Sequence, residues 1–271
     1  MLANRAVILA LGLAFLGFQA IAQDKADASA KPEEAKSPIT ASISAATDYT
    51  FRGISQTKNR GALQGTFEYA HESGVYAGVF GSNVKFPDQT GVAEDRTRYE
   101  VDLSAGYRFE TGPLSWDLGA IAYTYPGEGR RPMPPNTGAN DTHYRYYEGQ
   151  VKATYEAIKE KLSFTLQYNR SPNYYGDSGR TQYYAISSKA ALPEDFTVSA
   201  GMGRSLIRHN DRFGTQDYYD WVVGIAHPLF IDALVLELRY VDTSVTKGAC
   251  NIPANGTVCS ARGMVVLTYN F

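Results

Sequence analysis

The chain contains 271 residues, of which 44% are hydrophobic, 13% aromatic and 20% charged, and 20 are tyrosines. This composition excludes a disordered or collagen-like polymer and predicts one substantial folded domain. The 26 basic and 28 acidic residues give a formal net charge of −2. No strong positive field is present, which argues against nucleic acid as a partner.

The first 22 residues have the pattern of a secretory signal peptide. Arg5 precedes an apolar run at 6–18, and Ala20 and Ala22 form a small-x-small cleavage pattern ahead of Gln23. The apolar run is shorter than the roughly 20 residues that a membrane-spanning helix needs. Any residence in a membrane is therefore expected to use strands.

Residues 23–38 form a second segment of distinct composition. They mix both charges and contain no aromatic or branched apolar residue, so they lack the apolar surface needed to order themselves. We expect a flexible periplasmic tether, followed by a folded domain at 39–271.

From residue 39 onward the sequence alternates with a period of two, which is the repeat of a strand with one apolar and one polar face. The clearest case places Tyr99, Val101 and Leu103 opposite Glu100 and Asp102. Similar segments predict about twelve strands. They lie at 41–52, 62–71, 75–84, 97–109, 114–125, 143–156, 162–169, 181–192, 196–206, 218–227, 233–242 and 261–271.

The connections between these strands alternate between short turns and long loops. An even number of strands with this asymmetry is typical of antiparallel up-and-down transmembrane β-barrels, which have short periplasmic turns and long extracellular loops. A soluble barrel or sandwich also alternates, but it buries its apolar face inside.

The aromatic residues favour the membrane barrel, because many of them fall at the ends of predicted strands and could form interfacial girdles. The residues expected at the outer rim are Tyr49, Phe51, Tyr99, Tyr123, Tyr125, Tyr144, Tyr146, Tyr147, Tyr168, Tyr183, Tyr184, Tyr219, Trp221 and Tyr240. The residues expected at the inner rim are Tyr69, Tyr76, Tyr107, Phe109, Trp116, Tyr155, Phe196, Phe230, Tyr269 and Phe271.

Charged residues on the polar strand faces are costly toward lipid and are therefore expected to face a wet lumen. The lumen-lining candidates are Arg98, Glu100, Asp102, Arg108, Lys152, Glu237 and Arg239. Asp48 and Arg52 are expected at the mouth, where Arg52 either holds an anionic solute or braces the loop through a carboxylate such as Asp48. The arginine-containing loop at 126–142 could fold inward or remain outside.

The segment at 47–84 carries a more specific pattern, with Phe51-Arg52-Gly53-Ile54-Ser55-Gln56 followed by Ser82-Asn83-Val84. It resembles the opening of the TorF-type family of porin-like proteins, which are proteobacterial outer-membrane proteins of unknown function. The resemblance implies a barrel of the porin type and supplies no ligand or catalytic residue.

His71 and Ser73 form the one arrangement that suggests catalysis, since outer-membrane phospholipases place a His and a Ser two residues apart. Here the pair falls on a predicted short turn, and Asn83, the candidate to orient the His, falls at the far end of the following strand. We therefore expect no catalytic residue. The other histidines are scattered, so neither a metal site nor a cofactor is expected.

Cys250 and Cys259 are the only cysteines and fall in one predicted loop. In an exported chain such a pair is expected to form a disulfide.

The leading hypothesis is an outer-membrane porin that passes small polar solutes by passive or gated diffusion. The alternative is a non-conducting structural or surface-interaction barrel that acts through its extracellular loops. Twelve strands lie between the filled eight-stranded barrels and the open sixteen-stranded ones, so both hypotheses stand. Outer-membrane lipid is the expected environment, and the C-terminal strand ending at Phe271 is expected to contact the barrel-assembly machinery.

Overall fold

The computed structural model describes residues 37–86, 97–128, 144–210, 216–246 and 257–271. The predicted signal peptide at 1–22 and residues 23–36 of the predicted tether lie outside the described residues. So do Cys250 and most of the 126–142 loop. Within the described ranges, no helix is long and apolar enough to cross a membrane.

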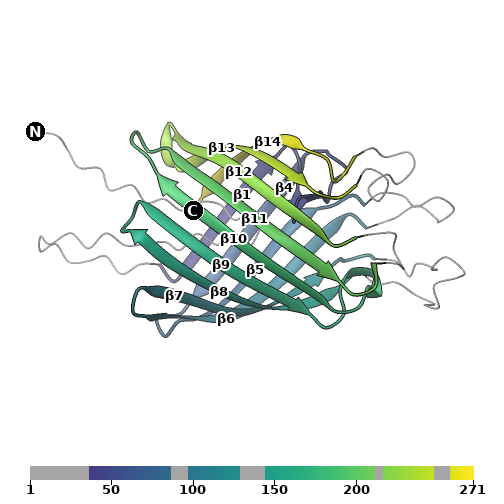
Figure 1. Cartoon of the computed structure of the whole chain (residues 1–271). Helices are drawn as coiled ribbons and strands as arrows, with labels where there is room; N and C mark the ends of the chain where they lie inside the picture. Colours follow the sequence, from purple (N-terminus) through teal and green to yellow (C-terminus); the bar gives the residue numbers. More distant parts are fainter. Residues whose placement is uncertain (1–36, 87–96, 129–143, 211–215, 247–256) are drawn as a thin grey trace, which may run out of the picture.

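Twelve antiparallel strands close into one barrel, in which β1 pairs with both β4 and β14 (Figure 1). This confirms the predicted fold. The barrel strands are β1 (Ile39–Ala46), β4 (Ala62–Ala70), β5 (Val75–Asn83), β6 (Tyr99–Thr111), β7 (Leu114–Thr124), β8 (Tyr146–Ile158), β9 (Leu162–Ser171), β10 (Thr181–Ala191), β11 (Thr197–Ile207), β12 (Tyr218–Leu229), β13 (Ile231–Thr243) and β14 (Arg262–Asn270).

The strand bounds alternate between short and long separations: β4 and β5, or β6 and β7, follow each other within a few residues at one end of the barrel (Figure 1), whereas at the other end at least nine residues separate consecutive barrel strands. The described part of the chain also begins and ends at the rim of short turns. There, the Pro38 carbonyl accepts a hydrogen bond from Ala70, and the Phe271 amide donates to Ala41. By the asymmetry of membrane barrels, the short-turn rim corresponds to the periplasmic side.

The two faces of the barrel wall differ in polarity, as the alternation predicts. On β6, Leu103 points outward and is 55% exposed, whereas Asp102 points inward and is 1% exposed. The same contrast separates the outward Leu166, Val223 and Leu267 from inward polar groups on the same strands. An apolar exterior around a polar interior fits a lipid-facing barrel and does not fit a soluble one.

The prediction of a first strand at 41–52 is wrong in its second half. β1 ends at Ala46, and residues 47–61 leave the wall before β4 begins at Ala62. Ala46 and Ala62 are directly paired, so the residues between them form a closed excursion. This segment, the inward hairpin, contains a separate two-stranded sheet of β2 (Thr50–Phe51) and β3 (Ile54–Ser55).

The predicted outer aromatic girdle is also partly wrong. Tyr147 is 63% exposed on the lipid side, but its neighbour Tyr146 is 4% exposed on the inner side, because consecutive residues of a strand point to opposite faces. The outward tyrosines at this rim include Tyr99, Tyr147, Tyr184, Tyr219 and Tyr240. The buried ones are Tyr49, Tyr123, Tyr125, Tyr144, Tyr146 and Tyr183, and at the other rim Tyr76 is buried as well.

The outer half of the barrel therefore has an aromatic core. Tyr49 of the inward hairpin packs there with wall residues that include Phe80, Tyr123 and Val266. The short 3-10 helix η1 (Tyr175–Asp177), between β9 and β10, adds Tyr175 to its edge.

Candidate functional site

The inward hairpin turns at Arg52 and Gly53, between β2 and β3. Both residues have positive φ, 47° and 79° respectively, as a type I′ turn requires, and this turn suits the twist of a two-residue hairpin. The Arg-Gly pair noted in the sequence is therefore the tip of the hairpin and not the end of the first barrel strand.

Gly53 also lies against the far wall of the barrel. A Cβ atom at this position would stand 2.3 Å from Thr243 Cγ2 on β13 and 3.1 Å from Asp220 Cβ on β12. Both the turn geometry and the close approach to the wall thus require glycine.

Arg52 extends from the tip to Glu148 on β8. Its Nη2 lies 2.6 Å from Glu148 Oε2, and both side chains are almost completely buried. Asn169 Nδ2 on β9 donates to the same carboxylate oxygen at 3.1 Å, and the Tyr123 hydroxyl lies 3.4 Å from it. The remaining oxygen, Glu148 Oε1, has no hydrogen-bond partner among the described residues.

Aromatic rings surround the Arg52 guanidinium group. Its Cζ lies 4.1 Å from the ring centroid of Tyr183 on β10 and 5.9 Å from that of Tyr174. Its Cζ also lies 4.7 Å from the ring centroid of Phe51, whose ring meets that of Tyr123 edge to face at 5.6 Å. These contacts combine cation–π and aromatic attraction with the ion pair.

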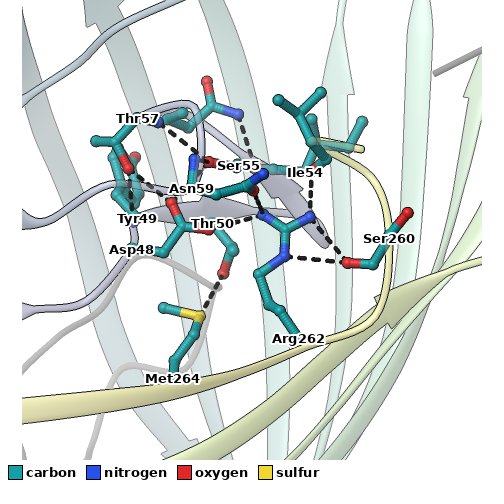
Figure 2. A network of polar contacts seen from close by, with 12 residues as sticks. Asp48, Tyr49, Thr50, Ile54, Ser55, Thr57, Asn59, Ser260, Arg262 and Met264 are labelled. Carbon is teal, nitrogen blue, oxygen red and sulfur yellow. Dashed lines mark hydrogen bonds and ion pairs between the residues drawn. The ribbon is translucent and has the colours of Figure 1, made fainter. Parts of the chain in front are cut away.

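The base of the hairpin is held by a second ion pair, shown in Figure 2. Arg262 Nη1 on β14 lies 2.7 Å from Asp48 Oδ2 and 2.6 Å from Asn59 Oδ1. The other oxygen of Asp48 accepts hydrogen bonds from the hydroxyls of Ser55 and Thr57, both at 2.6 Å. Asp48 thus ties the two arms of the hairpin to each other and to the wall.

These contacts place the hairpin across the lumen. Starting between β1 and β4, it contacts β5 through Tyr49 and Phe80, whose ring centroids are 5.7 Å apart. Its tip contacts β7, β8 and β10 through Phe51 and Arg52, and β12 and β13 through Gly53. The hairpin therefore occupies the cross-section of the barrel in its outer half.

Two further carboxyl groups face the outer lumen from β6. Glu100 is buried, with one oxygen 3.2 Å from the Tyr125 hydroxyl. Its other oxygen and both oxygens of Asp102 have no hydrogen-bond partner among the described residues.

A separate charged cluster occupies the periplasmic half of the lumen. Arg108 on β6 forms two hydrogen bonds to Glu68 on β4, at 2.6 and 2.9 Å, and its Nε lies 3.3 Å from Asp117 Oδ2 on β7. The Tyr76 hydroxyl donates to the other oxygen of Asp117 at 2.7 Å, and the Tyr76 ring lies 3.9 Å from the guanidinium carbon. Opposite charges thus bridge three strands here.

The other predicted lumen residues occupy different positions. Lys152 on β8 is buried and paired in register with Asp117. Glu237 and Arg239 on β13 form a 2.6 Å ion pair with each other. Arg98 is exposed and precedes β6. At the mouth, the suggested pairing of Arg52 with Asp48 is wrong, because Arg52 pairs with Glu148 and Asp48 with Arg262.

His71 and Ser73 are brought together on the exposed β4–β5 turn, where His71 Nδ1 lies 2.9 Å from Ser73 Oγ. Asn83 is bound elsewhere: its side chain accepts from the Leu63 amide at 2.7 Å and donates to the Gly61 carbonyl at 3.2 Å. No group of three or more His, Cys, Asp or Glu residues in the described ranges could hold a metal ion. Cys259 is disulfide-bonded.

A family model described as "Bacterial protein of unknown function (Gcw_chp)" matches residues 32–271. The chain belongs to the Gcw_chp family. This match covers nearly all of the chain and includes the hairpin and all barrel strands. The resemblance to TorF-type proteins rested on residues 47–84 alone. A search of curated proteins finds no match.

The Gcw_chp chain shares its fold with the solved KdgM porin, and two further structures align with lower scores. The KdgM porin, solved in complex with disordered oligogalacturonate, is 8% identical with a TM-score of 0.51, and the alignment covers 86% of this chain and 98% of that one. The outer membrane protein Omp33 of Acinetobacter baumannii is 9% identical with a TM-score of 0.44, covering 86% and 97%. OccAB1 of the same organism is 11% identical with a TM-score of 0.44, covering 83% and 60%.

Proposed function

We propose that this protein is an outer-membrane channel of the porin type that passes small polar solutes, and that the inward hairpin is its gate. The observation that carries the proposal is the charged inner wall. Beyond the hairpin, the wall continues into the periplasmic half with Arg108, Asp117 and Lys152. Charged groups on the inside of a lipid-facing barrel suit a hydrated path.

The hairpin is suited to act as a gate because ion pairs, in addition to aromatic packing, attach both its tip and its base to the wall. The tip is held by Arg52 and Glu148 and the base by Asp48 and Arg262. The direct pairing of Ala46 with Ala62 means that the wall closes without the hairpin. Movement of residues 47–61 would therefore open the outer lumen and leave the barrel intact.

The test compares single-channel conductance of the refolded wild-type protein with that of a variant in which residues 48–60 are replaced by a short Gly-Ser linker of about four residues, a normal hairpin length. A heat-modifiable gel shift establishes that each barrel has folded. We expect discrete conductance steps from the shortened variant, and shorter or rarer openings from the wild type.

A non-conducting barrel that acts through its extracellular loops is the second candidate, and the hairpin across the lumen favours it. Under this alternative the interior is filled for stability. The shortened variant would then fold and remain silent, and the search for function would move to the outer loops.

The surroundings of the barrel follow from the same proposal. The outward apolar band would contact outer-membrane lipid, and β14 would be recognised by the barrel-assembly machinery. Phe271 follows β14 and is 79% exposed, which leaves it accessible to such a partner. Deletion of Phe271 is expected to reduce the fraction of heat-modifiable barrel recovered from cell membranes, whereas substitution of exposed Arg60 is not.

A further inference from the structure

Asp102 and Glu100 are buried acidic side chains of the outer lumen for which the described residues supply no counter-ion. Asp102 is 1% exposed, and neither of its carboxyl oxygens has a hydrogen-bond partner within the described ranges. The nearby Arg52 is already paired with Glu148. A buried carboxylate without a partner is strongly unfavourable, so such a group either takes up a proton or is compensated by a positive group.

The two carboxyl groups lie on the inner face of the barrel wall. They are two residues apart on β6 and project from the same face of the strand, roughly 6.6 Å apart along it. In the sheet register, Asp102 lies between Phe80 on β5 and Tyr123 on β7. Tyr49 of the inward hairpin packs on Phe80, and its buried hydroxyl faces the Glu100 carboxyl group.

This combination of groups selects among cations. A calcium ion takes six to eight oxygen ligands and a magnesium ion keeps an octahedral shell of oxygens and waters, whereas the rings on both sides of Asp102 supply no oxygen ligand from their faces, and the described residues contain no cluster of three potential metal-binding side chains. Two carboxylates beside the aromatic rings of Phe80, Tyr123 and Tyr49 instead offer the ion-pair and cation–π contacts that an ammonium group prefers.

We propose that Glu100 and Asp102, together with the rings of Tyr49, Phe80 and Tyr123, form a binding site for a small organic cation of the ammonium type. The inference rests on the proposed function in that it names the class of solute that such a channel would select. Binding itself requires no conduction.

The experiment follows the unfolding temperature of the full refolded chain in an uncharged detergent by far-ultraviolet circular dichroism. The probe is n-propylammonium chloride, compared with sodium chloride and with sodium propionate at equal ionic strength. We expect n-propylammonium to raise the unfolding temperature in a saturable manner, and the two sodium salts to lack this effect. Such a shift is the expected signature of a ligand that binds only the folded state.

Two variants locate the effect. Glu100→Gln combined with Asp102→Asn should abolish the n-propylammonium shift. Glu237→Gln, which removes a lumen carboxylate on β13, should retain it. An equal shift in the Glu100→Gln/Asp102→Asn variant would overturn the assignment of the site, and an equal shift with sodium chloride would overturn the ligand class.

The hairpin-shortened variant removes Tyr49 and leaves Glu100, Asp102, Phe80 and Tyr123 in an uncovered lumen, so absence of a saturable shift in both this variant and the wild type would also overturn the proposal. Reversal potentials measured in a propylammonium chloride gradient test the proposed channel independently of the proposed binding site. A silent barrel with an intact thermal shift defeats the proposed channel and leaves the binding site standing. A conducting barrel without the thermal shift overturns the binding site and leaves the proposed channel standing.

Discussion

Arg52 and Glu148 form a 2.6 Å ion pair across the lumen, between residues 96 positions apart in the chain. Arg52 lies at the tip of the inward hairpin and Glu148 on the barrel wall. The pair is sequestered among aromatic rings, so it is shielded from water and salt. Its removal should therefore have a larger effect than the loss of an exposed ion pair.

Substitution Arg52→Ala is expected to lower the free energy of unfolding by about 3–5 kcal/mol, because it leaves the Glu148 carboxylate buried without its counter-ion. Urea unfolding in detergent micelles would measure this loss. The control is Arg60→Ala, at an exposed position of the same hairpin. The double variant with Glu148→Ala should lose less than the sum of the two single variants; strict additivity would show that the pair is not coupled.

Substitution Gly53→Ala is expected to destabilise the protein for two reasons, the positive φ of 79° and the 2.3 Å approach to Thr243 Cγ2. Gly112→Ala is the control that separates the effect of positive φ from the effect of the close contact. Gly112 has a φ of 57°, and no described atom lies within 4 Å of the position that a Cβ would take there. The control should lose only about 1 kcal/mol from the backbone conformation, and Gly53→Ala more, as measured by urea unfolding.

The clash at Gly53 can be tested further by making room for the new methyl group. Thr243→Ser removes the Cγ2 atom and keeps the hydroxyl that donates to the Cys259 carbonyl at 2.8 Å. It should recover part of the stability lost in Gly53→Ala. If it recovers nothing, the hairpin tip does not contact β13 in this way.

Substitution Arg108→Gln is expected to cost about 1.5–3 kcal/mol, since it removes charged hydrogen bonds to Glu68 and Asp117 in the periplasmic half. Arg108→Lys should restore the charge but only part of the stability, because an ammonium group cannot reproduce the two parallel bonds to Glu68. Urea unfolding of both variants at low and high salt would measure these losses of stability. Arg145→Ala, which breaks an exposed pair with Glu128, should cost less than about 1 kcal/mol.

The lipid-facing assignment predicts a dependence on depth along one face of β6. Leu103→Arg places a charge toward the middle of the apolar band and should cost about 2–4 kcal/mol, whereas Tyr99→Arg at the outer end of the strand should cost about 0–1 kcal/mol through its charge. Refolding into lipid vesicles with urea titration would measure both. Equal costs at the two positions would contradict the membrane orientation.

The sequence alone determined the class of fold, the number of barrel strands and the polarity of the two faces. These features depend on local period-two alternation and on turn spacing, which are properties of neighbouring residues. The alternation of Leu103 with Asp102, for example, separates an apolar from a polar face, and the aromatic strand ends and the asymmetry of the loops then favoured the polar face as the lumen side. The same reasoning placed Arg108 and Lys152 on the inner face without identifying their neighbours.

The tertiary structure alone decided where residues 47–61 go and which charges meet. The alternation in Tyr49, Phe51 and their neighbours looks like the end of a strand, and only the closure of β1 on β14 and β4 leaves these residues free to cross the lumen. Pairings such as Arg52 with Glu148 and Asp48 with Arg262 join residues distant in the chain. They depend on barrel register and curvature, which no local pattern encodes.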